Sequence, residues 1–265
     1  MATRFSKIEK SFPDRKIYQI ILDRPDKLNA LSRDMIQTLI TDFQEAHRLS
    51  KSEEILCLIV GSSSEPKAFC AGADLAERMQ MSEAEVGETL KDLRTLMDSC
   101  AQFPFPTIAA IHGIAFGGGL ELALACDIRI SSPGSMMGLT ETRLGIIPGA
   151  GGTQRLSRLV GLAKAKELIF SGKRISAIEA EKIELVNFLA DDPFEAARKF
   201  AIEITDGGPL ALLSAKKAID EGLGLSLERA LDLERTCYQK VLVSEDRLEG
   251  LKAFVEKRKP RFLGK

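Results

Sequence analysis

Two glutamates stand beside glycine-rich stretches, and they are the first residues in this sequence that could do chemistry. Glu121 follows three consecutive glycines in Ala115-Phe-Gly-Gly-Gly-Leu-Glu, and Glu141 precedes a second cluster, Pro148-Gly-Ala-Gly-Gly152. Glycine lets backbone N–H groups approach a ligand closely, and a helix start adds unpaired donors with a partial positive charge. Two N–H groups aimed at one carbonyl oxygen would form an oxyanion hole. If the two carboxylates converge, one can deprotonate a water while the other donates a proton.

A third segment, Lys67-Ala-Phe-Cys-Ala-Gly-Ala-Asp-Leu75, is a loop rich in small residues after an apolar run. Structural roles compete with the catalytic interpretation, because glycine-rich turns are often plain tight turns and a glutamate in a first helical turn is often a surface residue. Neither glycine cluster has the pattern of a P-loop or of a dinucleotide-binding turn. On the residues alone, an active site and a structural role both stay open.

The elements that must position these segments alternate between strands and helices in the first part of the chain. Apolar runs predict strands at 17–22, 55–60, 107–111 and 128–130, and helical spacing predicts helices at 82–100 and from Gly119 through Cys126. Ser32 is a suitable N-cap for a further helix that runs to about Arg48. Later segments all have helical patterns, at 163–170, 177–184, 193–205, 210–221 and 225–243. We expect a stacked, parallel-type α/β core followed by a helical C-terminal region.

Composition describes an ordinary globular protein of 265 residues with a formal net charge of −1, which gives no general attraction to nucleic acid or anionic membranes. The five cysteines are odd in number and lack CxxC spacing, so we expect buried, reduced thiols and no metal site. No secretory signal or membrane span is recognisable. We expect a bacterial cytoplasmic protein or a mature protein of an organellar matrix. With only His47 and His112, and no GxSxG motif, a hydrolase triad is disfavoured.

At the three segments the sequence resembles the enoyl-CoA hydratase/isomerase (crotonase) superfamily, and the likeness runs from about Arg24 to Phe262. Its landmarks here are RPDKLNAL, KAFCAGADL, AFGGGLELALACD, ETRLGIIPGAGGTQRL, KELIFSGKRISAIEA and EDRLEGLKAFVEKRKPRF. The resemblance implies an α/β fold: a spiral of ββα turns with a C-terminal helical trimerisation region. It places the catalytic core in residues 1–200 and the region for oligomerisation and CoA contacts in residues 201–265. A homotrimer or hexamer is expected.

The same resemblance assigns roles to individual residues. Glu121 and Glu141 match the two hydratase glutamates, and the backbone N–H groups of Ala73 and Gly118 match the oxyanion donors. The positions that resemble CoA or substrate contacts are Ala71, Asp74, Leu75, Lys27, Phe254 and Lys257. One departure from the family pattern is Glu184, where relatives generally have glycine.

Both glutamates together favour an enoyl-CoA hydratase, since isomerisation can proceed with one carboxylate. The alternatives are a 3,2-enoyl-CoA isomerase and a non-catalytic acyl-CoA-binding or RNA-binding member of the fold. The runs around Glu121 and in the tail resemble the methylglutaconyl-CoA hydratase branch of leucine breakdown. Its substrate carries an extra carboxylate, for which Arg143 is the candidate cation, although a surface role fits Arg143 equally well. No cofactor is expected, because CoA is part of the substrate.

Some members of that branch bind RNA through a lysine-rich early helix. The matching stretch at 32–52 mixes acidic with basic side chains, so we expect no strong nucleic-acid binding. The basic tail at 257–261 could attract the phosphates of CoA, but a solvated tail is an equally good interpretation.

Overall fold

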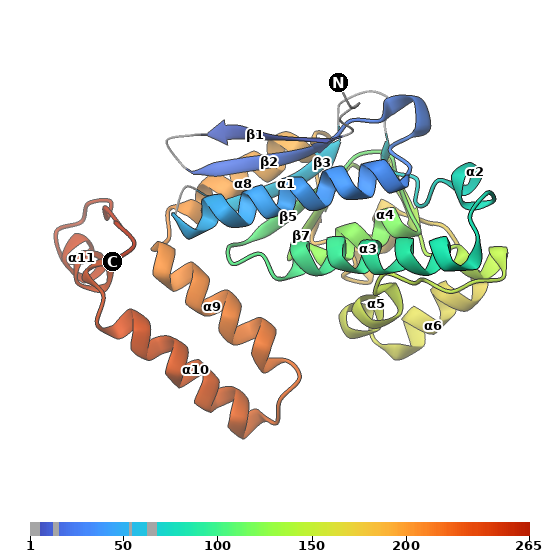
Figure 1. The fold of residues 1–265 in the computed structure, drawn as a ribbon. Helices are drawn as coiled ribbons and strands as arrows, with labels where there is room; N and C mark the ends of the chain where they lie inside the picture. Colours follow the sequence, from blue (N-terminus) through green and yellow to red (C-terminus); the bar gives the residue numbers. More distant parts are fainter. Residues whose placement is uncertain (1–5, 13–15, 53–54, 63–67) are drawn as a thin grey trace.

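The computed structural model describes residues 6–12, 16–52, 55–62 and 68–265, and a six-stranded sheet forms its centre (Figure 1). The strands lie in the order β1-β2-β3-β5-β7-β10. Only β1 is antiparallel to its neighbour, and the other pairs are parallel. Their bounds are Ser6–Phe12, Ile17–Leu22, Cys57–Ser62, Thr107–Ile111, Ile128–Ser131 and Phe188–Leu189 for β1, β2, β3, β5, β7 and β10. The predicted parallel-type core is therefore confirmed.

Both faces of this sheet are covered, which explains the near-continuous apolar runs of its strands. Alternate residues of β3 enter two separate hydrophobic clusters: Leu58 and Val60 pack with α1 and α3, and Cys57 and Ile59 pack with α8. The helices are α1 (Arg33–Lys51), α3 (Glu83–Ala101) and α8 (Pro193–Thr205). Figure 1 shows α1 and α3 in front of the sheet and α8 behind it.

A second, four-stranded sheet has the order β4-β6-β8-β9, and the sequence patterns did not predict it. It comprises β4 (Ala68–Cys70), β6 (Ile114–Phe116), β8 (Met136–Gly138) and β9 (Ile175–Ser176). These strands have two or three residues, too few for an alternating pattern. Each of β3, β5 and β7 is followed by a strand of this second sheet, so the chain winds as a spiral of ββα turns. This is the architecture that the family resemblance implies.

Side-chain caps fix where the first helices begin. The Ser32 hydroxyl accepts a hydrogen bond from Met35 N–H, which confirms the predicted N-cap of α1. Ser82 and Glu85 form a reciprocal capping box at the start of α3. The short helix α2 (Leu75–Arg78) begins in the same way, because the Asp74 side chain accepts a hydrogen bond from Glu77 N–H.

The remaining helices divide into two groups (Figure 1). One group stays close to the sheets and comprises α4 (Gly118–Ala125), η3 (Glu141–Leu144), α5 (Gly152–Val160), α6 (Leu162–Ser171) and α7 (Ala177–Lys182). The other group extends away from the sheets and comprises α9 (Pro209–Gly222), α10 (Leu227–Leu242) and α11 (Glu245–Val255). An ion pair between Lys216 of α9 and Asp127 connects this second group to the core. The division of the chain after residue 200 stays a prediction; that position lies within α8.

Two further expectations concern the cysteines and Glu184. All five cysteines lie buried as free thiols, as the composition indicated. Glu184 has a φ of 61°, a left-handed conformation that glycine adopts most easily. The departure from glycine at this position therefore falls at a turn just after α7.

Candidate active site

Glu121 lies in the first turn of α4 and is almost fully buried, with 3% of its surface exposed. Its Oε1 accepts hydrogen bonds from the N–H groups of Ala150, at 2.8 Å, and Gly152, at 2.7 Å. Burial raises the pKa of Glu121, and the two hydrogen bonds and the charge of Arg155 only partly offset this effect. Within the described residues, no hydrogen bond reaches Oε2 of Glu121. One carboxylate oxygen is thus held in place while the other can meet a reactant.

Glu141 is the first residue of η3, and its carboxyl group has a different environment. Its Oε2 is buried and has no hydrogen-bond partner in the described part of the chain. Burial raises the pKa of Glu141 to about 7, with a further increase from the charge of Glu121 and a partial offset by the backbone N–H of Glu141 itself. At neutral pH this carboxyl group therefore exchanges readily between its protonated and ionised forms.

The glycine clusters and the glutamates are paired crosswise. The second cluster supplies the N–H groups that hold Glu121, the acid of the first cluster. Gly117 of the first cluster lies beside Glu141, so close that a β-carbon at Gly117 would be 3.3 Å from Glu141 Oε1. Gly117 also has a φ of 50°, which favours glycine. The two glutamates that the sequence singled out therefore converge on one site.

Two backbone N–H groups border the same site. Gly118 is the first residue of α4, so its N–H has no acceptor within the helix. Gly72 brings the neighbouring loop close, because a β-carbon there would lie 2.8 Å from Phe116 O and 3.6 Å from Gly118 N. Among the described residues, the N–H groups of Ala73 and Gly118 donate to no protein acceptor. Two such N–H groups, placed together beside two carboxylates, can polarise a carbonyl while the carboxylates transfer protons next to it.

Known proteins are similar to this chain in both sequence and fold. A sequence model described as enoyl-CoA hydratase/isomerase matches residues 14–265. The chain belongs to the enoyl-CoA hydratase/isomerase family. Members of this family, also called the crotonase family, act on acyl-CoA substrates.

Similarity to individual family members extends over nearly the whole chain. A probable enoyl-CoA hydratase 2, mitochondrial, from Arabidopsis thaliana is 48% identical over 95% of this chain and 83% of its own length. The human methylglutaconyl-CoA hydratase, mitochondrial, is 43% identical over 95% of this chain and 75% of its own length. The crystal structure of an enoyl-CoA hydratase from Bacillus anthracis superposes with a TM-score of 0.94 at 43% identity, covering 98% of this chain and all of the other. These likenesses support the family assignment from sequence and from fold.

Most of the expected CoA contacts gather around the loop at 71–75. Ala71 N–H donates to Leu28 O at 3.0 Å, and Lys27 is exposed one residue earlier, at the end of η2 (Pro25–Lys27). Leu75 begins α2 and is half exposed. The carboxylate of Asp74 is engaged within the protein, since it caps α2 and pairs with Arg24. Asp74 therefore contributes to the shape of this crotonase-family loop.

Three expected contacts lie elsewhere in the chain. The Arg143 side chain packs over Gly172 at the end of α6, where a β-carbon would be 2.7 Å from Arg143 Cγ. Phe254 is 84% exposed on α11, and Lys257 follows the same helix. Figure 1 shows α11 far from α4 within this chain. A role of Phe254 or Lys257 at the site of this subunit is therefore not visible, and their assignment stays a prediction.

The basic tail also has partners of its own. Arg258 forms a bidentate ion pair with Glu249 and a second ion pair with Glu256. Arg261 N–H donates to Glu249 Oε1. The tail is thus tied to α11, and the guanidinium of Arg258 is not free to attract phosphate.

The sequence patterns missed the residues that hold Glu121. Ala150 and Gly152 were noted as part of a glycine cluster beside Glu141, but their N–H groups serve the other glutamate. Arg155 lies one turn later, donates to Ala150 O and pairs with Asp98. A glycine cluster that immediately precedes a helix was the available signal, although it does not reveal which acid the N–H groups will meet.

No group of three or more His, Cys, Asp or Glu side chains in the described ranges is arranged to hold a metal ion. In the same ranges, no helix combines the length and apolarity needed to cross a bilayer.

Proposed function

We propose that this protein adds water to a 2-trans-enoyl-CoA to give a 3-hydroxyacyl-CoA, with no cofactor beyond the CoA of the substrate. The observation that carries this proposal is the convergence of Glu121 and Glu141. One carboxylate is anchored by two backbone N–H groups, and the other has a pKa of about 7. Hydration needs one group to activate water at C3 and one to deliver a proton at C2, and two differently held carboxyl groups supply both.

In the proposed reaction, the N–H groups of Ala73 and Gly118 bind the thioester oxygen. Attack of water at C3 moves electron density to that oxygen, and the two donors, with the helix dipole of α4, stabilise the developing enolate. The enolate collapses when a proton is delivered to C2. The charge of Glu121 adds to the rise in the pKa of Glu141, and the two carboxyl groups together supply the acid and the base of the reaction.

Isomerisation of a 3-enoyl-CoA is the alternative, because one carboxylate can shuttle a single proton. The second carboxylate favours hydration over isomerisation. The substrate branch is a finer question, and methylglutaconyl-CoA is proposed on the resemblance of the segments around Glu121 and in the tail. The names of the relatives support either a general hydratase or this branch. We further propose a homotrimer or hexamer assembled through α9–α11, and an organellar matrix or bacterial cytoplasm as its location.

The test follows the loss of enone absorbance with crotonyl-CoA and 3-methylglutaconyl-CoA in parallel. We expect hydration by the wild type and a loss of about 10²- to 10⁴-fold in Glu121→Gln and in Glu141→Gln. Glu181→Gln, at an exposed position on α7, is the matched control and should keep full activity. The faster substrate identifies the branch. A folded wild type that binds CoA but hydrates neither substrate would contradict the proposal, and conversion of a 3-enoyl-CoA would then support the isomerase.

A further inference from the structure

We infer that the ion pair between Arg24 and Asp74 is a positioning device that aims the Ala73 N–H at the thioester oxygen. This inference rests on the proposed function and deepens it, because it explains how one oxyanion donor is kept free and oriented. Neither side chain needs to touch the reacting atoms. Both act through the backbone that lies between them.

Leu31 pairs with Ala73 in a parallel bridge, in which the N–H and C=O of Leu31 bond to the two residues on either side of Ala73. Leu31 N–H donates to Gly72 O at 2.7 Å, and Asp74 N–H donates to Leu31 O at 3.1 Å. In a parallel bridge of this kind, the residue that lies between the two bonded neighbours, here Ala73, directs its own N–H and C=O away from the partner strand. The bridge therefore leaves the Ala73 N–H unpaired and turns it away from Leu31.

The segment before Leu31 holds the strand that leads into this loop. The buried Asn29 side chain donates to Ala68 O at 2.8 Å and to Phe69 O at 3.2 Å. Leu28 and Asn29 both have positive φ values, 51° and 55°. Consecutive non-glycine residues in this region are strained and persist only where surrounding contacts impose them. The segment 24–31 thus acts as a template for residues 68–74.

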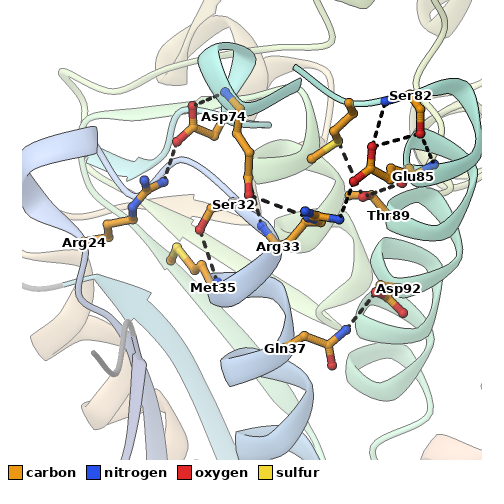
Figure 2. A network of polar contacts seen from close by, with 12 residues as sticks. Arg24, Ser32, Arg33, Met35, Gln37, Asp74, Ser82, Glu85, Thr89 and Asp92 are labelled. Carbon is orange, nitrogen blue, oxygen red and sulfur yellow. Dashed lines mark hydrogen bonds and ion pairs between the residues drawn. The ribbon is translucent and has the colours of Figure 1, made fainter. Parts of the chain in front are cut away.

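Arg24, the first residue of the segment 24–31, connects this segment to the loop that contains Ala73. Figure 2 shows its guanidinium pointing at Asp74. One nitrogen, Nη1, donates to Ala30 O at 2.8 Å and to Asp74 Oδ2 at 2.8 Å. The guanidinium thereby joins the residue before Leu31 to the residue after Ala73. The two side chains are only 13% and 12% exposed, so solvent screens their attraction less than at the surface.

The two oxygens of Asp74 have separate tasks. Oδ1 accepts Glu77 N–H and caps α2, while Oδ2 pairs with Arg24. Partial burial raises the pKa of Asp74, but the hydrogen bond from Arg24 and the α2 N–H groups outweigh it and hold the pKa below its usual value. Asp74→Asn can keep the cap, because asparagine is an equally good N-cap, and it removes the charge that Arg24 meets. The cap and the ion pair can therefore be separated by experiment.

Arg33 offers a matched control in the same region. It also connects α1 to the following helices, through Glu77 and Glu85 (Figure 2). Its side chain is 47% exposed, and its guanidinium does not contact residues 72–74 in the described structure. Arg33→Met thus removes two nearby ion pairs and leaves the bridge around Ala73 intact.

The test measures carbonyl polarisation and turnover separately in Arg24→Met, Arg24→Lys, Asp74→Asn and Arg33→Met. The probe is 4-dimethylaminocinnamoyl-CoA, whose absorption moves to longer wavelength when hydrogen bonds polarise its carbonyl. We expect Arg24→Met and Asp74→Asn to lose much of this red shift and to lower kcat for crotonyl-CoA about 10- to 100-fold, less than the 10²- to 10³-fold cost of losing a whole donor. KM should change little. Arg24→Lys should restore most of both readouts, and Arg33→Met should match the wild type.

The inference is overturned if folded Arg24→Met and Asp74→Asn keep the full red shift, whatever happens to kcat. It is also overturned if Arg33→Met reduces the shift as much as they do, since the effect would then be general loosening. If Arg24→Met does not fold, Asp74→Asn alone decides. A wild type that shifts the probe but hydrates neither crotonyl-CoA nor 3-methylglutaconyl-CoA contradicts the proposed function while this inference stands.

Discussion

Ionising Glu141 costs free energy, because its Oε2 is buried with no hydrogen-bond partner among the described residues and the charge of Glu121 lies nearby. Folding raises its pKa from 4.5 to about 7, so the folded protein holds this proton more tightly than the unfolded chain. The stability that the proton contributes is fully present below pH 4.5 and is lost as the pH rises through about 7. Above that pH, an ionised Glu141 destabilises the fold.

The size of this effect follows from the two pKa values. A rise from 4.5 to about 7 corresponds to about 3 kcal/mol, which we reduce to about 2 kcal/mol because solvent reaches part of the side chain. Glu141→Gln removes the titration and keeps the shape. We therefore expect this variant to be more stable than the wild type at pH 8.5 by about 2 kcal/mol, or about 4–8 °C in Tm. The gain should shrink to less than half at pH 5.

Thermal unfolding of the wild type and Glu141→Gln at the two pH values is the assay, with Glu181→Gln as the control that should follow the wild type. The same Glu141→Gln protein is expected to lose hydration activity about 10²- to 10⁴-fold, so Glu141 supports catalysis at a cost in stability. A variant that is no more stable than the wild type at pH 8.5 would refute the reasoning. An equal gain at both pH values would also refute it, because the effect would then not come from ionisation.

Two other substitutions test features outside the glutamate pair. Glu184→Gly should stabilise the protein by about 0.5–1 kcal/mol, because relief of a left-handed residue exceeds the added flexibility of glycine in the unfolded chain; denaturant unfolding checks this, and an equal gain in Glu184→Ala would contradict it. Arg143→Leu should lower activity on 3-methylglutaconyl-CoA more than on crotonyl-CoA if Arg143 meets the extra carboxylate. Equal losses in the two kcat/KM values would show that Arg143 serves only as a cover over Gly172.

Local patterns were sufficient for much of the fold. The strands at 17–22 and 107–111 and the helix at 193–205 were predicted with the bounds that the structure has. Long apolar runs, proline at a helix start and serine caps are signals that neighbouring residues carry by themselves. The strands β4, β6, β8 and β9 could not be predicted in this way, because each is defined by distant partners and is too short to show a period.

The sequence by itself determined the kinds of groups at the candidate site: two glutamates, each next to a cluster of glycines, and a small-residue loop that ends in Asp74. Only the tertiary structure decided how they combine. It paired the N–H groups of Ala150 and Gly152 with Glu121, placed Gly117 against Glu141, and used Leu31 to leave the Ala73 N–H free. The physical reason is that hydrogen bonds, burial and charge act across space between segments far apart in the chain. A carboxyl group's pKa and an N–H group's direction therefore depend on neighbours that no local pattern names.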